Sequence, residues 1–242
     1  MSETNTALTN QWNDFLLRQV DPYATAKYEI LLDWLGNIAG RSALVVGSGS
    51  GELAALMAGK GAKVTAIDIS EEYVELTRKT AQRFQVPMET AVAKLEDFHP
   101  GKKYDIVAAT DVIEHIEDDQ AAVQQLKELL SEEGTLVITV PALPALFGYH
   151  DEVLGHFRRY TASSLRALIS GGFEISRLRY YGLFLIPVAL LISRILRRPY
   201  PVKAAGNQKS ALGAIIRSVF SWEKIMSPPL GTSLLLTARP RR

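Results

Sequence analysis

The stretch "LVVGSGSGEL", Leu44 to Leu53, is an apolar run that ends in three glycines at alternate positions, Gly47, Gly49 and Gly51. The apolar part reads as a buried strand, and glycine lets the backbone that follows turn sharply and approach a ligand closely. A strand that leads through a glycine loop into a helix is typical of nucleotide-binding α/β folds. We therefore expect a nucleotide-containing cofactor at this loop.

The segments around the loop alternate between strand and helix patterns. This alternation predicts βαβ units and a mostly parallel sheet whose ligand lies at the carboxyl ends of the strands. Ser70 and the residues near Asp119 are expected to begin helices. The predicted strands are "KVTAID", a short one in "METAVA", "YDIVAAT", "GTLVITVP", "FEISRLRYY" and, at the end of the chain, "TSLLLTARP".

Length and composition predict one α/β domain that carries an insertion. The chain has 242 residues, of which 47% are hydrophobic, and no cysteine, which excludes a disulfide framework and a thiolate nucleophile. The first residues are polar, so we expect no signal peptide. The expected parts are a helical cap over 1–40 with Trp12, Phe15 and Leu16 on one face, a core over 41–182, an insertion over 183–229 and a closing strand over 230–242.

The predicted insertion combines an apolar run with a basic amphipathic helix. "LFLIPVALLISRIL" is apolar on every side for fourteen residues, which is too short to span a bilayer, and it contains Pro187 and Arg194. These features predict a lid, a membrane-facing element or both; packing on the core or on a second subunit is the alternative. The apolar stripe of the helix consists of Leu212, Ile215, Ile216, Val219, Trp222 and Met226.

The net charge of +1 hides an asymmetry along the chain. Residues 177–242 hold twelve Lys or Arg against Glu223 alone, whereas residues 1–176 hold fifteen against twenty-five acids. Either the two parts neutralise each other, or the basic part meets an anionic lipid surface or an anionic substrate.

The residues after the glycines exclude some nucleotides. A triphosphate loop needs Lys and Ser or Thr after its last glycine, and here Glu52 and Leu53 follow. The spacing is G-x-G-x-G rather than the G-x-G-x-x-G of dinucleotide sites, which leaves an NAD-dependent oxidoreductase as a minor alternative. Asp68, seventeen residues after Gly51, is placed to accept hydrogen bonds from ribose hydroxyls; a turn-forming role is the alternative.

Together with "VTAIDIS", "AKLEDF", "YDIVAATDVIEHIED" and "GTLVITVP", the glycine loop resembles class I S-adenosylmethionine (SAM)-dependent methyltransferases. The resemblance runs from about Arg41 to Pro141 and includes the closing strand. It implies a Rossmann-like α/β fold: seven strands, mostly parallel with an antiparallel last strand, and helices on both faces. It also implies SAM as the cofactor.

The resemblance assigns cofactor-binding roles by position. The loop Gly47–Gly51, with Ser48, would pass under the methionine part of SAM. Asp68, beside Ile69, would hold the ribose, and Thr110 would line the sulfonium pocket. Lys94 stands where the family often has an acid for the adenine amino group, and a lysine cannot accept a hydrogen bond. That role passes to the Leu95 backbone, Glu96 or Asp97.

The stretch "TDVIEHI" is the first candidate for chemistry on the acceptor. On a helical turn, Asp111, Glu114 and His115 would share one face. This pattern resembles the acid-x-x-Glu-His motif of methyltransferases that O-methylate quinone precursors and of those that cap small-RNA 3′ ends, some of which bind a divalent metal such as Mg. It predicts a metal site at these three residues, or His115 as a base or orienting group. A loop-fixing role is the alternative.

The stretch "ALFGYHDEVLGHFRRYT" follows the fifth strand and is the second candidate. It resembles the HDxxxGHxRRY signature of a bacterial subgroup of these enzymes, and in this fold the connection faces the acceptor. We expect His150 or His156 to complete a metal site or to act as base. The alternative is a salt-bridged loop that anchors the next helix, the role we favour for Arg158. Further candidates are Tyr160 for catalysis and Tyr149, Asp151 and Arg159 for acceptor binding.

The sequence thus predicts a SAM-dependent methyltransferase with a hydrophobic, lipid-like or phenolic acceptor, and favours O-methylation. The alternatives are C- or N-methylation of a small molecule, methylation of RNA, and a non-catalytic SAM-binding subunit. RNA is disfavoured because the basic residues stand among long apolar runs without interleaved exposed aromatics. A cytoplasmic enzyme, peripheral on the inner face of the membrane and open to homodimer formation, is expected.

Overall fold

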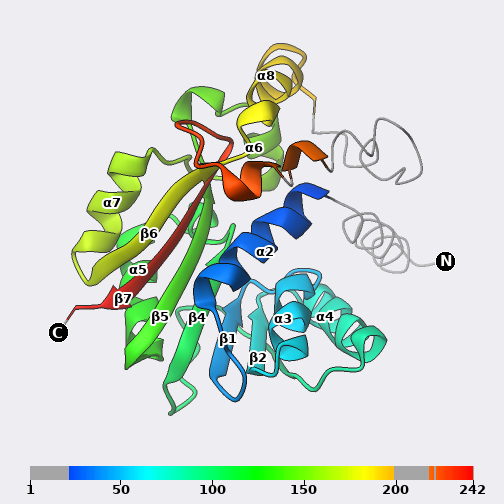
Figure 1. The fold of residues 1–242 in the computed structure, drawn as a ribbon, viewed down its shortest axis with the longest axis vertical. Helices are drawn as coiled ribbons and strands as arrows, with labels where there is room; N and C mark the ends of the chain where they lie inside the picture. The colour runs from blue at the N-terminus through cyan, green and yellow to red at the C-terminus, as the bar shows by residue number, and fades with distance from the viewer. Residues whose placement is uncertain (1–21, 199–217, 221, 242) are drawn as a thin grey trace.

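The computed structural model describes residues 22–198, 218–220 and 222–241. Its centre is a seven-stranded sheet in the order β3-β2-β1-β4-β5-β7-β6, with helices on both faces (Figure 1). The strands β1 to β5 pair in parallel, and β7 is antiparallel to both neighbours, as the sequence predicts. The strands are β1 Ser42–Val46, β2 Lys63–Asp68, β3 Glu89–Val92, β4 Tyr104–Thr110, β5 Leu130–Pro141, β6 Phe173–Tyr181 and β7 Ser233–Pro240.

Helices cover the two faces of the sheet and form separate cores. One core joins α2 and α3 to the sheet through Leu31 and Met57, and the other joins α5 and α7 through Leu126 and Leu165. Because both faces are covered, the central strands are apolar without alternation. The helices are α2 Pro22–Leu35, α3 Glu52–Gly59, α4 Glu71–Phe84, α5 Asp119–Leu129, α6 Tyr149–Leu154, α7 Ala162–Ser170 and α8 Ile186–Ala189, with short turns η1 Ile113–His115, η2 Pro144–Leu146, η3 Leu183–Leu185 and η4 Leu190–Ile195.

Strand register brings the candidate residues to one edge of the sheet. Val46 pairs with Ile67 of β2 and with Ala109 of β4. Gly47, Asp68 and Thr110 therefore come next at the carboxyl ends of three neighbouring strands. The helix that follows Asp68 begins where expected, since the Ser70 hydroxyl accepts a hydrogen bond from the Tyr73 amide at 3.4 Å.

The segment between β6 and β7 is held at its base by Glu223. Its buried carboxylate accepts hydrogen bonds from the amides of Gly182 at 2.6 Å and Phe184 at 3.3 Å. Phe220 is also buried, beside Tyr23 and Tyr181, whereas Trp222 and Met226 of the predicted apolar stripe are exposed.

Two sequence predictions for helices extend beyond the described residues. Trp12, Phe15 and Leu16 of the expected cap lie outside them, as do Leu212, Ile215 and Ile216 of the stripe. Among the described helices, none has both the length and the apolar character needed to cross a membrane.

Candidate functional site

The glycine loop turns through three left-handed residues, Gly47, Gly49 and Gly51, with φ of 63°, 52° and 79°. A Cβ at Gly47 would lie 2.5 Å from Val112 Cγ2, and one at Gly51 would lie 2.8 Å from Thr77 Cα. At Gly49 a Cβ would meet nothing within 4 Å. Gly47 and Gly51 therefore have no room for a side chain because other parts of the protein pack against them. Gly49, between them, borders open space at the edge of the sheet.

Asp68 is buried beside this loop and is fixed by it. Its Oδ2 accepts a hydrogen bond from the Gly49 amide at 2.9 Å, and its Oδ1 accepts one from the Ser70 amide at 3.0 Å. A carboxylate has about four acceptor positions, so each oxygen keeps one for a ligand hydroxyl. The arrangement suits recognition of a diol such as ribose.

The other predicted cofactor residues surround this edge in different ways. The Ser48 hydroxyl is hydrogen-bonded to the Thr77 hydroxyl at 2.9 Å, and Ile69 exposes its side chain next to Asp68. The Leu95 side chain belongs to the hydrophobic core, which leaves only its backbone for a ligand. Glu96 and Asp97 are exposed, and Thr110 is half-buried at the end of β4.

Alanine substitutions at two of the glycines should separate folding from cofactor binding. We expect Gly51→Ala to destabilise the protein by about 2 kcal/mol or more, because its Cβ meets the backbone of α4 at an unfavourable φ. Gly49→Ala has only the φ strain of about 1 kcal/mol, so it should fold and lose cofactor affinity. Urea denaturation and S-adenosylhomocysteine (SAH) titration check both variants; equal stability losses would contradict this assignment.

A second group of side chains lies at the same edge, next to Val112, which contacts the glycine loop. Glu114, His115 and His156 each bring one ligand-type atom into a set within 4.8 Å of one another. Glu114 is completely buried, and its carboxylate oxygens have no hydrogen-bond partner among residues 22–198, 218–220 and 222–241. Burial, followed by the charge of Asp111, raises the pKa of Glu114 well above its usual value. Such an orphaned carboxyl group points to a ligand.

Neighbouring groups orient the two imidazole rings. His156 Nδ1 lies 2.8 Å from Asp151 Oδ1, and the rings of His156 and His115 meet edge to face with centroids 4.6 Å apart. His115 hydrogen-bonds to the backbone of Leu154 and Gly155. Burial, followed by the charge of the nearby His156, lowers the pKa of His115 and so favours the neutral ring.

The buried Asp151 ties the HDxxxGHxRRY segment together. Besides His156, it accepts hydrogen bonds from Arg159 Nε at 2.7 Å and from the Gly148 amide at 3.0 Å. Burial opposes ionisation, but these donors outweigh it and lower the pKa of Asp151. Arg159 also donates to the Ala142 carbonyl at 3.1 Å, so it acts here as the partner of Asp151.

Asp111 does not share a helical face with Glu114 and His115, contrary to the spacing argument. The short helix η1 begins only at Ile113, and Asp111 has a left-handed φ of 55°. Its carboxylate forms an ion pair with the buried Lys27 of α2 and accepts a hydrogen bond from the Thr139 hydroxyl at 2.9 Å. The clustered ligand atoms among the described residues thus include His156 in place of Asp111.

Lys27 is a site residue that the sequence reasoning missed. The signal was a single lysine on the buried face of α2, between Ala26 and Ile30. An ammonium group at such a position needs a partner of opposite charge, but the sequence does not show that the partner is Asp111.

The remaining candidates have structural partners. The buried Tyr160 donates its hydroxyl proton to Asp119 Oδ2 at 2.8 Å, and Arg158 forms an ion pair with the same carboxylate at 2.9 Å. This is the salt-bridged arrangement that the sequence left as an alternative. The His150 amide donates to Ser193 Oγ at 2.9 Å, and Arg197 lies over the Tyr149 ring at 5.7 Å.

Comparison with known proteins gives a family match and similar solved structures. Residues 16–175 match the family described as "Methyltransferase domain". Over 103 residues the chain is 33% identical to a ubiquinone biosynthesis O-methyltransferase of Actinobacillus pleuropneumoniae, covering 40% of this chain and 44% of that one. Over 148 residues it is 33% identical to the enzyme of that name from Xanthomonas campestris, covering 58% and 61%.

The chain thus spans about half the length of these curated relatives. Among solved structures, magnesium protoporphyrin IX methyltransferase of Synechocystis with bound SAM has the same fold. Its TM-score is 0.56 at 19% identity, with coverage of 97% of this chain and 84% of that one.

Proposed function

The chain belongs to the methyltransferase-domain family, with the class I SAM-dependent fold, and on that basis we propose that it methylates a phenolic oxygen of a lipophilic, quinone-related acceptor. The observation that carries this proposal is the group Glu114, His115 and His156 beside the glycine loop. It provides proton-accepting or metal-binding atoms next to the expected cofactor. The name shared by the curated relatives supports oxygen as the methylated atom.

The residues of the glycine loop fit SAM. Asp68 would hold the ribose hydroxyls, and the open space at Gly49 would admit the methionine part. Thr110 would face the sulfonium, and the Leu95 backbone, Glu96 or Asp97 would receive the adenine amino group. SAM supplies an activated methyl group and its own leaving group, SAH. The protein's task is to align the acceptor and to take one proton from it.

We assign the proton to His156. Asp151 holds its Nδ1, which leaves Nε2 as the acceptor for the phenolic proton while the oxygen attacks the methyl carbon. Arg159 and the Gly148 amide fix Asp151 in turn, so the ring is held in one orientation. The proposed base is therefore supported by a carboxylate that two other hydrogen-bond donors hold in place.

The same residues fit a divalent cation as an alternative to proton transfer at His156, because Nε2 cannot bind a cation and accept the phenolic proton at the same time. Glu114 provides two oxygens without a partner in the described part of the chain, and both imidazoles have their other ring contacts fixed by Asp151 or by backbone, as in metal sites. Two imidazoles and one carboxylate suit Mn, Fe or Zn better than Mg, which prefers oxygen ligands. A bound cation would supply Lewis-acid polarisation of the phenolic oxygen.

The test uses two phenols that differ only in an isoprenoid chain, with labelled SAM and mass spectrometry of the product. We expect O-methylation with at least tenfold higher kcat/KM for the chain-bearing phenol. Label on nitrogen or carbon, a preference for RNA, or no turnover with either phenol would instead favour the alternative activities or a non-catalytic subunit. Equal kcat/KM for the two phenols would contradict a lipophilic acceptor.

His156→Asn is expected to lower kcat about 10²- to 10⁴-fold and to leave the Kd for SAH within about twofold. The matched control is His99→Asn, which changes an exposed histidine outside this group and should leave kcat unchanged. A bound cation would be established by two results together. Chelation abolishes activity and Mn restores it, and the Glu114→Gln variant no longer binds Mn. Activity that survives both treatments would leave His156 as base without a metal.

A further inference from the structure

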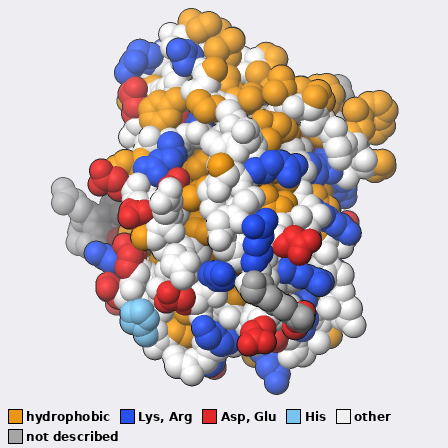
Figure 2. Space-filling view, turned by 90° about the vertical axis from the view of Figure 1, so that its left-hand side faces the viewer, with side chains coloured by type: hydrophobic (Ala, Val, Ile, Leu, Met, Phe, Trp, Pro, Cys, Tyr) orange, Lys and Arg blue, Asp and Glu red, His pale blue; other side chains and the backbone are white. Residues whose placement is uncertain are grey.

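Large apolar side chains are exposed at the end of the molecule that carries α8. Ile225 is 87% exposed, and Trp222 and Ile195 are each 64% exposed. Figure 2 shows hydrophobic side chains gathered at this upper end, with Lys and Arg beneath them. We call this region the apolar end surface; it consists of Phe184, Val188, Leu190, Leu191, Ile195, Leu196, Trp222, Ile225, Met226 and Leu230.

The charged side chains that the apolar end surface itself carries are basic, although Arg197 pairs with Glu152 of α6 at 3.0 Å and Lys224 with Glu29 of α2 at 2.5 Å. The segment 183–198 carries Arg194, Arg197 and Arg198 and no acid. In the other segment of the surface, 222–230, the acid is Glu223, and it is buried. Exposed apolar groups with a basic margin are typical of elements that lie in a membrane interface. The arginines of segment 183–198 outnumber the one acid that pairs with them, Glu152, and this basic excess favours an anionic lipid surface as the partner.

The apolar end surface is fastened to the candidate acceptor loop. Ser193 is completely buried, and its Oγ accepts the His150 amide hydrogen bond. A Cβ at Gly148 would lie 2.8 Å from that same Oγ. Arg194 donates to the Ala145 carbonyl at 2.5 Å. The segment that would meet lipid therefore also holds the chain that leads to Asp151 and His156.

We propose that the apolar end surface docks the protein on a bilayer containing anionic lipid and so places the acceptor loop at the membrane. Its relevance to methyl transfer rests on the proposed function, because a lipophilic acceptor resides in the bilayer. Trp222, Ile195 and Ile225 enter the boundary between headgroups and acyl chains. The nearby arginines meet the anionic headgroups, and Ser193 links the docked segment to the loop before His156.

The test is co-sedimentation of the full chain with vesicles of phosphatidylcholine alone or with 30% phosphatidylglycerol. We expect binding to the anionic vesicles that weakens in high salt. The double variant Ile195→Asp/Ile225→Asp should bind at least tenfold more weakly. The matched control, Leu56→Asp/Phe84→Asp, changes two exposed apolar residues of α3 and α4 and should bind like the parent protein.

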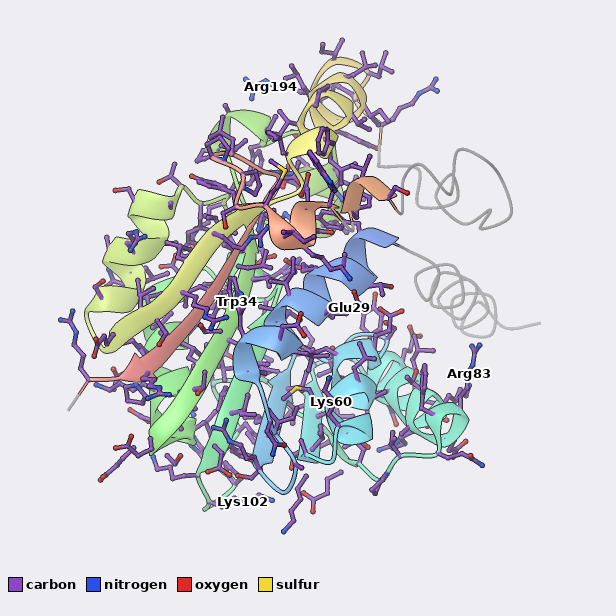
Figure 3. The ribbon with its side chains drawn as sticks, viewed as in Figure 1. Glu29, Trp34, Lys60, Arg83, Lys102 and Arg194 are labelled. Carbon is purple, nitrogen blue, oxygen red and sulfur yellow. The ribbon has the colours of Figure 1, made fainter. Side chains whose placement is uncertain are left out.

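A second pair of variants isolates the charges. Arg198→Gln should weaken binding to anionic vesicles about fivefold, whereas Arg83→Gln should leave it unchanged. Both arginines are exposed. Figure 3 shows Arg83 on α4, far from Arg194 and α8.

Several results would overturn the docking proposal. The protein could fail to bind vesicles, it could bind both vesicle types equally, or the control variant Leu56→Asp/Phe84→Asp could lose as much vesicle binding as Ile195→Asp/Ile225→Asp. Sedimentation equilibrium tests for a dimer. If the parent protein is a dimer, Ile195→Asp/Ile225→Asp makes it a monomer and neither form binds vesicles, then a second copy of the chain covers the apolar end surface instead of lipid. Vesicle binding is read without SAM or acceptor, so its failure leaves methyl transfer to soluble, detergent-dispersed phenol unaffected. Conversely, failure of methyl transfer leaves the vesicle result standing.

Discussion

Replacing Asp68 with alanine is expected to weaken SAH binding about hundredfold or more. Two charge-assisted hydrogen bonds to the ribose, at roughly 1.5–3 kcal/mol each, account for this loss. The structure adds a second contribution, because the same carboxylate holds the Gly49 and Ser70 amides and so fixes the glycine loop. Isothermal titration of SAH into both proteins gives the ratio of the two Kd values directly.

The control for Asp68 is Glu71→Ala, which removes an exposed acid three residues further on and should change the Kd by no more than about twofold. Asp68→Asn keeps the shape and one acceptor oxygen, and we expect about tenfold weaker binding. Thermal denaturation establishes that each variant is folded. A folded Asp68→Ala protein with a Kd within threefold of the parent value would show that the ribose lies elsewhere.

Asp111→Asn is expected to lower the free energy of unfolding by about 3 kcal/mol, more than Lys27→Met does. The asymmetry follows from burial: the Lys27 side chain is 6% exposed and the Asp111 side chain 40%. Without Asp111 the ammonium group stays buried and loses its charged partner. Without Lys27 the carboxylate still reaches water. Urea denaturation of the three proteins measures both differences.

The pH dependence of this ion pair has a defined sign. Burial alone would raise the pKa of Asp111, but Lys27 and the Thr139 hydroxyl outweigh it and lower that pKa. The stabilisation by the pair is therefore complete above the ordinary carboxyl pKa of about 4 and is lost as the pH falls through the lower folded value. The stability gap between parent and Asp111→Asn should narrow in acid. A larger loss in Lys27→Met, or a constant gap, would contradict this account.

The sequence predicted the fold because its signals are local and repeated. Apolar strands alternate with capped helices, and the register of three neighbouring strands then places Gly47, Asp68 and Thr110 together. The sequence also indicated that the loop needs a glycine at position 51. The reason, that a Cβ there would clash with the backbone of Thr77, is a tertiary contact that the sequence does not show. Asp151, His156 and Arg159 lie within nine residues of one another, so their mutual contacts could have been predicted from the sequence.

The parts that the sequence did not predict depend on contacts across long separations. His156 joins Glu114 and His115 from more than forty residues away, and Lys27 reaches Asp111 from the first described helix. The helical spacing for Asp111 was wrong because one left-handed residue separates it from η1. Tyr160 was predicted to be catalytic from its place in the HDxxxGHxRRY stretch, whereas its hydrogen-bond partner, Asp119, lies 41 residues away along the chain.

Methyl transfer to a lipophilic phenol is tested by incubating the protein with methyl-labelled SAM and a membrane extract, with Asp68→Ala as the control. We expect label to enter the organic phase with the parent protein and to fall to background with the variant. The labelled product should be an O-methylated phenol that carries a lipophilic chain. Label confined to the aqueous or protein fraction, or no label in any fraction, would contradict this expectation.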